Sequence, residues 1–240
     1  MEDARTATRL IRQNTYMASL DLQDAYYLLP IHEDDRKYLR FLFEGQLYEF
    51  TCLPFGLASA PYAFTKLLKP LVQYLRSRGV TCINYLDDFL FLGDSKNECG
   101  NNIQLAVELL SSLGFLINSQ KSMLTPNTRC KFLGFIFDSI KMSIELPLEK
   151  WEKILRWIHY FKKRTVCTIQ KLARFIGIVT SACPAVKYGW AHTKLFERAK
   201  YLALKRSRGN YRSNMSIPQN LFEDKGHKNA TNKQYNDLKK

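Results

Sequence analysis

Residues 81–93, TCINYLDDFLFLG, place two adjacent carboxylates, Asp87 and Asp88, between two short apolar runs. The flanking runs, 80–85 and 89–92, have the length and the β-branched and aromatic side chains of strands, so the stretch predicts a hairpin. Burying an unpaired carboxylate is costly, or forces it to take up a proton. The sequence therefore calls for an explanation of two acids within one of its most hydrophobic stretches.

Two interpretations of this acid pair are open. Asp favours β-turns for local hydrogen-bonding reasons, so the pair could simply occupy the turn. Against this, a two-residue hairpin turn normally needs a residue with positive φ, usually Gly, and no Gly follows the pair. Adjacent like charges in an apolar setting also repel each other unless a cation neutralises them. Asp21, a lone acid in the apolar context of SLDLQDAYY, offers a third carboxylate. Oxygen ligands without His or Cys favour Mg²⁺ or Mn²⁺, and two such ions about 4 Å apart support phosphoryl transfer.

The composition narrows the class of protein. The 240 residues are 46% hydrophobic, so a real core is expected, and 36 Lys and Arg against 22 Asp and Glu leave a formal charge of +14. Such a charge favours a polyanionic partner such as nucleic acid or an acidic membrane surface. The six cysteines form no CxxC pair, the first residues are too polar for a signal peptide, and no apolar run reaches about 18 residues. We expect an intracellular protein with reduced thiols, no zinc and no membrane span.

The order of predicted elements indicates an α+β domain followed by a helical one. Strands and helices alternate over residues 1–147, and alternating apolar residues around Glu44 and Gly45 predict two strands joined by a tight turn. Amphipathic helices are predicted at 59–79, with Pro61 in the first turn and Gly79 as a stop, and at 101–113. Residues 148–204 have helical periodicity alone. Residues 205–240 are polar, rich in Asn and Lys and poor in apolar anchors, which predicts a disordered tail.

Four motifs follow one another along the chain: SLDLQDAYYLLPIHEDDRKYLRF at 19–41, LPFGLASAPYAF at 53–64, YLDD at 85–88 and KFLGFIFD at 131–138. Together they resemble the reverse transcriptase family, whose YxDD box is similar to YLDD. Their order and spacing match those of the family, and the resemblance covers residues 16–204. The resemblance implies a right-hand polymerase palm, in which an antiparallel sheet packs on helices, with partial fingers and a helical thumb. It is greatest to retrotransposons of the gypsy-like or DIRS-like groups.

The resemblance implies an RNA-directed DNA polymerase that transfers a nucleotide from a dNTP to a primer 3′-hydroxyl. Asp21 and Asp87 would ligate both metal ions, Mg²⁺ or Mn²⁺, with help from the Leu22 carbonyl, and Asp88 would assist beside them. The family's life cycle implies a location in the cytoplasm or the nucleus.

The resemblance also implies a set of contacts to the incoming nucleotide: Asp24, Ala25, Tyr26, Phe55, Gly56 and Lys121. Tyr26 holds the steric-gate position, where an aromatic ring excludes a 2′-hydroxyl, although an ordinary core role is the alternative. Phe55 stands where retroviral relatives have a polar Gln. Lys121 matches a lysine near the pyrophosphate leaving group, although a lysine between a strand and a loop is usually solvated.

The helical region would be the thumb and would bind an RNA or DNA template-primer. Its basic residues would contact phosphates without reading sequence. They are Lys153, Arg156, Lys162, Lys163 and Arg164. The alternative is a plain solvent-exposed helix face.

Only about 20 residues precede Asp21, so the first fingers strands and their phosphate-clamping residues are expected to be missing. The tail contains no ribonuclease H domain, so RNA cleavage is not expected. We therefore expect weak or absent activity in isolation, from a truncated element. Two other readings stay open: a catalytically silent nucleic-acid-binding relic, and another palm-type nucleotidyltransferase.

Overall fold

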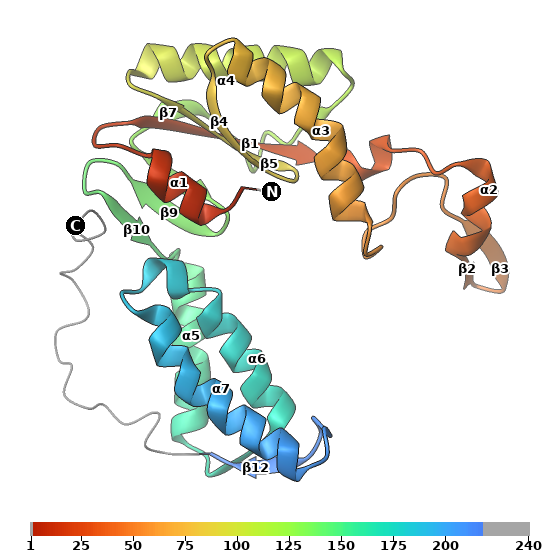
Figure 1. The fold of residues 1–240 in the computed structure, drawn as a ribbon, viewed down its shortest axis with the longest axis vertical. Helices are drawn as coiled ribbons and strands as arrows, with labels where there is room; N and C mark the ends of the chain where they lie inside the picture. The colour runs from red at the N-terminus through yellow and green to blue at the C-terminus, as the bar shows by residue number, and fades with distance from the viewer. Residues whose placement is uncertain (1, 218–240) are drawn as a thin grey trace. The chain divides into compact units, whose positions relative to one another are not determined.

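The computed structural model describes residues 2–217, and the chain divides into two compact units (Figure 1). Among the described residues, the first unit comprises 2–133 and 137–140, and the second comprises 134–136 and 141–217. Within residues 2–217, no helix combines the length and the apolar composition that crossing a membrane demands.

A five-stranded antiparallel sheet forms the centre of the first unit. Its order is β4-β5-β1-β6, and β7 also pairs with β1. The strands are β1 Tyr16–Gln23, β4 Thr81–Tyr85, β5 Asp88–Gly93, β6 Leu116–Ile117 and β7 Met123–Asn127. The hairpin predicted at residues 81–93 is therefore confirmed, and its second strand is paired on both sides.

Two long helices cover one face of this sheet (Figure 1). Helix α3, Ala60–Ser77, begins with Pro61 in its first turn and ends before Gly79, whose φ of +82° suits a glycine after a helix. Helix α4, Lys96–Ser112, starts five residues before the predicted helix. The reason is a capping arrangement in which the Ser95 hydroxyl accepts from the Glu98 amide while the Glu98 carboxylate accepts from the Asp94 amide.

The core of the first unit lies between the sheet and these helices. Its buried side chains come from β1, β5, α3 and α4 and include Leu20, Phe89, Phe91, Phe64, Leu68, Leu75, Ala106 and Leu110. Along β5, every residue after Asp88 is buried, so this strand is packed on both faces. Close packing of β1 and β5 holds the backbone at their ends, where the acidic residues lie.

Shorter elements complete the first unit. They are α1 Ala4–Leu10, η1 Ala25–Leu28, α2 Glu33–Arg36, η2 Lys37–Leu39, and the hairpin of β2 Arg40–Phe43 and β3 Gln46–Glu49. The hairpin turns at Glu44 and Gly45, where the sequence predicts a tight turn, and both residues have positive φ. Three short strands follow later in the chain: β8 Arg129–Phe132 in the first unit, β9 Phe135–Asp138 with residues of both units, and β10 Ser143–Glu145 in the second.

The second unit is mainly helical, as residues 148–204 predict. Its elements are α5 Leu148–Lys162, β11 Val166–Thr168, α6 Ile169–Thr180, η3 Cys183–Ala185, α7 Gly189–Arg206 and β12 Asn214–Ser216. Its core contains Phe161, Leu172 and Phe175, with Trp157 packed against them.

The predicted disorder of residues 205–240 differs from the structure over residues 205–217. Helix α7 continues to Arg206, and β12 pairs antiparallel with β11. The physical reason is that Ile217 is buried in the helical core and Met215 packs against it. Residues 218–240, the rest of the predicted tail, lie outside the described residues.

Candidate functional site

The turn between β4 and β5 contains one of the two adjacent acids, and β5 contains the other. Tyr85 pairs with Asp88, so Leu86 and Asp87 form a two-residue turn and Asp88 begins the strand. The expectation that such a turn needs a residue with positive φ is met by Leu86, at φ +55°, and not by a glycine. A left-handed conformation costs a non-glycine residue about 1–2 kcal/mol, so this turn stores strain.

Asp21 lies directly opposite Asp88 across the β1–β5 pairing. Opposite residues of neighbouring antiparallel strands project from the same face, so the two carboxylates share one face of the sheet. The Leu22 amide donates to the Asp87 carbonyl at 3.0 Å, which ties β1 to the turn. The structure thus brings together the three acids that the sequence predicts, over a separation of more than 60 residues.

Burial and neighbouring charges raise the pKa of two of the three acids, Asp87 and Asp88. The pKa of Asp88 is raised to about 6, first by burial and then by the charges of Asp87 and Asp21 and a hydrogen bond with Asp21. The pKa of Asp87 is also raised, first by burial, and the charge of Asp21 adds to the effect, while a backbone hydrogen bond opposes it. The ionised acids destabilise one another, and a cation among them would relieve this repulsion.

Lys121 brings one positive charge to this group. Its Nζ lies 3.9 Å from Asp21 Oδ1, and its side chain is 69% exposed. Because solvent surrounds the lysine and the contact is long, this pair offsets only part of the repulsion among the acids.

The donor set suits a hard cation, because carboxylate oxygens are the ligands that Mg²⁺ and Mn²⁺ prefer. The side-chain conformations are not those of a closed metal site. Among residues 2–217, no three His, Cys, Asp or Glu side chains are gathered closely enough to hold a metal ion. The backbone therefore collects the predicted ligands Asp21, Asp87 and Asp88, while the mutually repelling side chains do not form the predicted cage.

Tyr26 lies beside the acids and within the core at the same time. It is 6% exposed, and its ring stacks on Phe64 with centroids 4.7 Å apart. The pKa of its hydroxyl is raised first by burial and then by the charge of Asp87, so the phenol end lies close to the acid turn. The sequence offered a steric gate and a core residue as alternatives, and the packing is compatible with both.

The other predicted nucleotide contacts differ in exposure. Phe55 is 62% exposed, with its ring 5.0 Å from that of Tyr26, and Gly56 has φ +92°. Asp24 is exposed, has φ +52° and lines an open polar depression of about 410 Å³ together with Gln23 and residues 118–120. Ala25 is buried in the core, at 2% exposure.

Three polar residues that support the acids escape sequence reasoning. The Ser122 hydroxyl accepts from the Asp21 amide at 3.0 Å, and the Asn118 amide donates to the Asp21 carbonyl at 2.9 Å. The Asn84 side chain donates to the Leu86 carbonyl at 2.7 Å. Ser122 lies 101 positions from Asp21, so no local pattern could have identified it.

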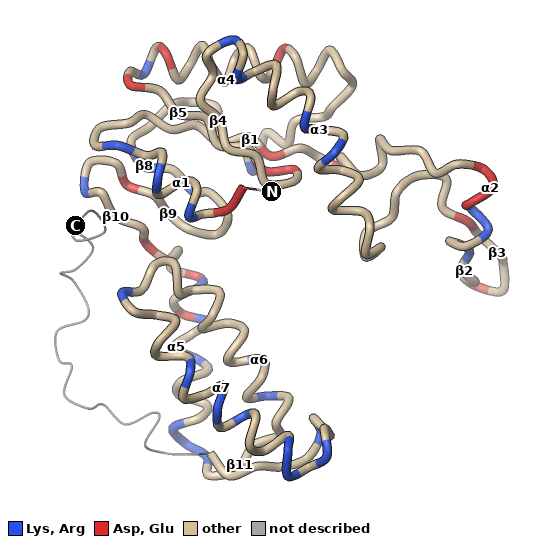
Figure 2. The backbone as a smooth tube through the Cα atoms, viewed as in Figure 1, with Lys and Arg blue, Asp and Glu red and all other residues tan. Residues whose placement is uncertain are grey.

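The five basic residues predicted to bind template-primer are all exposed on or just after α5. Figure 2 shows further Lys and Arg along α7 of the same unit. The Arg164 guanidinium lies 4.0 Å from the centre of the Tyr160 ring, so this part of the unit combines a cation with an aromatic face.

Comparison with known families identifies the first unit. Residues 1–137 match the model of a family described as "Reverse transcriptase (RNA-dependent DNA polymerase)". The chain is 28% identical over 171 residues to the enzymatic polyprotein of Soybean chlorotic mottle virus, covering 70% of this chain and 23% of the relative. It is also 28% identical over 167 residues to a retrovirus-related Pol polyprotein from transposon opus of Drosophila melanogaster, covering 69% and 15%. The chain thus spans about a quarter or less of these relatives.

Solved structures show the same fold. The foamy viral protease-reverse transcriptase in complex with RNA/DNA hybrid has a TM-score of 0.66 at 23% identity, covering 87% of this chain and 25% of that one. A second foamy viral structure, in complex with double-stranded DNA, has a TM-score of 0.65 at 23% identity, with 89% and 34% covered. Together with the mixed helices and antiparallel sheet, these likenesses confirm the predicted α+β polymerase fold.

Proposed function

The chain belongs to the reverse transcriptase (RNA-dependent DNA polymerase) family, and we propose that its first unit catalyses RNA-directed DNA synthesis. The observation that carries this proposal is the register of β1 against β5, which sets Asp21 opposite Asp88 and next to Asp87. A structural sheet gains nothing from acids placed so that the charge of Asp21 helps to raise the pKa of Asp87 and of Asp88. A site for divalent cations and phosphates does.

Asp21, Asp87 and Asp88 would hold the cations, together with the Leu22 carbonyl. When bound, the cations would lower the pKa of the attacking primer hydroxyl and neutralise the triphosphate. The chain's own contribution is to fix the backbone of the acids: Ser122 and Asn118 hold Asp21, and the sheet pairing holds Asp88. Cation binding would also require the side chains of the three acids to change conformation, because they do not form a closed metal site in their present arrangement.

The pocket for the incoming dNTP would form beside the acids. Tyr26 would act as the steric gate against a 2′-hydroxyl, because Phe64 behind its ring prevents it from giving way. Phe55 would flank the same space, in contact with Tyr26. The remaining contacts would come from Asp24, Ala25 and Gly56, and from Lys121 near the leaving pyrophosphate.

The second unit would hold an RNA or DNA template-primer through the exposed basic residues of α5. The net charge of +14 supports this, since phosphate contacts supply most of the sequence-independent affinity for nucleic acid. The polyprotein relatives support an origin in a retroelement, and the motif forms favour a gypsy-like or DIRS-like retrotransposon.

A second candidate function is nucleic-acid binding without catalysis. It is favoured by one observation, that the three acids do not form a closed metal site in their present conformations. In that case the basic second unit would bind nucleic acid while the first unit stayed silent.

A primer-extension assay separates these candidates. Wild type and Asp87→Asn are compared on an RNA template with Mg²⁺ or Mn²⁺, and template-primer binding is measured in parallel. Incorporation by wild type that falls about 100-fold or more in the variant, with binding unchanged, supports the polymerase. Binding by both proteins with incorporation by neither supports the silent candidate.

A further inference from the structure

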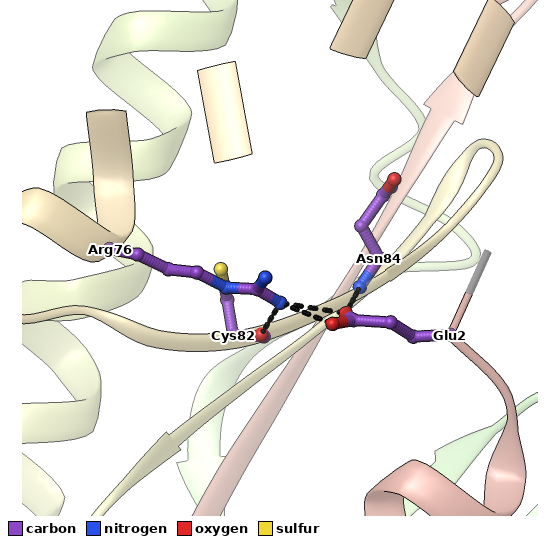
Figure 3. A network of polar contacts seen from close by, with 4 residues as sticks. All are labelled: Glu2, Arg76, Cys82 and Asn84. Carbon is purple, nitrogen blue, oxygen red and sulfur yellow. Dashed lines mark hydrogen bonds and ion pairs between the residues drawn. The ribbon is translucent and has the colours of Figure 1, made fainter. Parts of the chain in front are cut away.

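Strand β4 is an edge of the central sheet, so its outer backbone groups have no strand partner among residues 2–217. Glu2 takes that place at one residue (Figure 3). The Glu2 amide donates to the Asn84 carbonyl at 3.3 Å, and the Asn84 amide donates to Glu2 Oε2 at 3.0 Å. Residue 2 therefore satisfies both backbone groups of a residue two positions before the acid turn, 82 positions away in the chain.

Arg76, in the last turn of α3, holds Glu2 in this position. Its Nη2 donates to both carboxylate oxygens of Glu2, at 2.6 and 2.7 Å, and to the Cys82 carbonyl at 2.9 Å (Figure 3). Burial alone would lower the pKa of Arg76, yet the hydrogen bond and charge of Glu2 leave the pKa raised. Arg76 thus holds the Glu2 carboxylate by two hydrogen bonds and also covers a second carbonyl of the open strand edge.

Asn84 connects these contacts to the turn. Its side chain is largely buried, and its Nδ2 donates to the Leu86 carbonyl at 2.7 Å. Leu86 is the residue in the strained left-handed conformation, and Asp87 follows it directly. A strained turn persists only when its surroundings hold it, and this hydrogen bond acts on the strained residue itself.

We propose that Glu2, Arg76 and Asn84 form a clamp that positions the Leu86–Asp87 turn, and hence Asp87 and Asp88, for cation binding. The clamp rests on the proposed function in one respect, namely that the turn is positioned for cation binding. Its three members touch no reacting group and act through the backbone of β4, so they are positioning residues. On the other side of the turn, the Leu22 amide on the Asp87 carbonyl completes the support.

A purely structural role for the same contacts makes a different prediction. If Glu2 and Arg76 only fastened the N-terminal segment to the sheet, their loss would lower the thermal midpoint of unfolding without changing the requirement for Mg²⁺. A clamp on the turn instead changes the affinity of the acids for the cation. The Mg²⁺ concentration that gives half-maximal incorporation reports this affinity, and it does not depend on the fraction of the protein that is folded.

The experiment uses the 240-residue chain with any affinity tag at the C-terminus, so that residue 2 keeps its place. The variants are Glu2→Ala, Arg76→Met and Asn84→Leu, with Arg76→Lys as the conservative replacement. Glu98→Gln is the matched control, because Glu98 also accepts a backbone amide in this unit, but at the opposite end of β5. Each protein is assayed for the Mg²⁺ concentration that gives half-maximal incorporation, for kcat, and for KM of template-primer.

We expect the three clamp variants to need about 10-fold more Mg²⁺ and to lose kcat, with KM for template-primer unchanged. Arg76→Lys should fall between Arg76→Met and wild type, because it keeps the charge but not the two-oxygen contact. Glu98→Gln should retain the wild-type Mg²⁺ requirement. Unchanged Mg²⁺ dependence in Glu2→Ala and Arg76→Met would overturn the clamp even if both variants melt earlier.

Hydrogen exchange tests the clamp without relying on activity. Amides of residues 81–93 should exchange faster in Glu2→Ala and Arg76→Met, while amides of α4 keep their wild-type rates. Equal acceleration in both segments would mean a general loss of stability and would overturn the proposal. If wild type itself incorporates no nucleotide, the proposed function fails. The clamp is then still tested by this exchange pattern and by the shift of the unfolding midpoint that Mg²⁺ induces.

Discussion

Two hairpins of the first unit reverse direction over two residues, and they differ in what their turns are made of. The β2–β3 hairpin turns at Glu44 and Gly45, both with positive φ, and every residue of its two strands is exposed. The β4–β5 hairpin turns at Leu86 and Asp87, and Leu86 has positive φ. This hairpin belongs to the central sheet, and the residues of β5 after Asp88 are buried. Both turns hold a non-glycine residue, Glu44 or Leu86, in the left-handed region, and only the first turn also contains a glycine. The second turn holds acids at an apolar edge, which is where function is to be expected.

The largest effect on nucleotide incorporation should distinguish the acids beside the β4–β5 turn from the acid in the β2–β3 turn. Asp21→Asn and Asp88→Asn should each lower nucleotide incorporation about 100-fold or more, because each removes a charge from the set that would hold the cations. Glu44→Gln, which removes a carboxylate from the other turn, should leave incorporation at the wild-type level. Single-turnover primer extension with saturating template-primer measures this. Comparable losses in Glu44→Gln would break the distinction between the hairpins.

The next effect concerns the aromatic side chain beside the acid turn. Tyr26→Ala should lower the preference for deoxynucleotides over ribonucleotides about 10-fold or more, because it opens the space that a 2′-hydroxyl would need. Competition between the two nucleotides in one reaction reports a ratio, so partial unfolding of the variant does not affect it. Tyr27→Ala, at the exposed neighbour, is the control and should keep the wild-type ratio. An unchanged ratio in Tyr26→Ala would leave this residue with its core role alone.

The strain at the acid turn has a smaller electrostatic counterpart. In EDTA at pH 8, Asp88→Asn should raise the unfolding midpoint by about 1–3 °C, a modest gain because water screens the half-exposed carboxylate. Because the pKa of Asp88 is raised in the folded protein, its ionised form destabilises the fold. Adding Mg²⁺ should stabilise wild type more than the variant and so narrow the gap. A lower midpoint for Asp88→Asn in EDTA would show that its charge is not repelled in the folded state.

The smallest effect on function should come from the glycine turn. Gly45→Ala places a side chain at φ +78°, with no heavy atom within 4 Å of the new Cβ, so its cost is conformational alone. A cost of about 1–2 kcal/mol should speed amide exchange in residues 40–49 by roughly 5- to 30-fold. Residues 81–93 and nucleotide incorporation should stay as in wild type. Faster exchange in residues 81–93 would show that the two hairpins are coupled.

Local patterns in the sequence predict the elements of this fold well. Alternating apolar residues identify both hairpins, and helical spacing with Pro61 and Gly79 identifies α3. The start of α4 is missed by five residues, because the periodicity begins later than the cap that Ser95 provides. Strand β12 is missed because its two apolar anchors lie in a polar stretch and gain their stability from a distant helical core.

Contacts across the chain are less accessible to such patterns. The context of Asp21 suggested a partner for Asp87 and Asp88, and the family resemblance supplied the pairing. No local sequence pattern identifies Ser122 or Glu2 as a residue that holds these acids, because serine hydroxyls and glutamate carboxylates have many other roles in proteins. Side-chain conformation is also beyond the sequence, as the open arrangement of the three carboxylates illustrates.

The central claim is that Asp21, Asp87 and Asp88 act together as a cation site, and Mn²⁺ binding tests it most directly. Calorimetric titration of Mn²⁺ into wild type with bound template-primer, beside Asp21→Asn, Asp87→Asn and the control Glu44→Gln, measures binding without turnover. Saturable binding that each Asp→Asn change abolishes or weakens at least about 10-fold, and that Glu44→Gln retains, is the predicted result. Equal affinity for Mn²⁺ in wild type and in Asp21→Asn would contradict the claim.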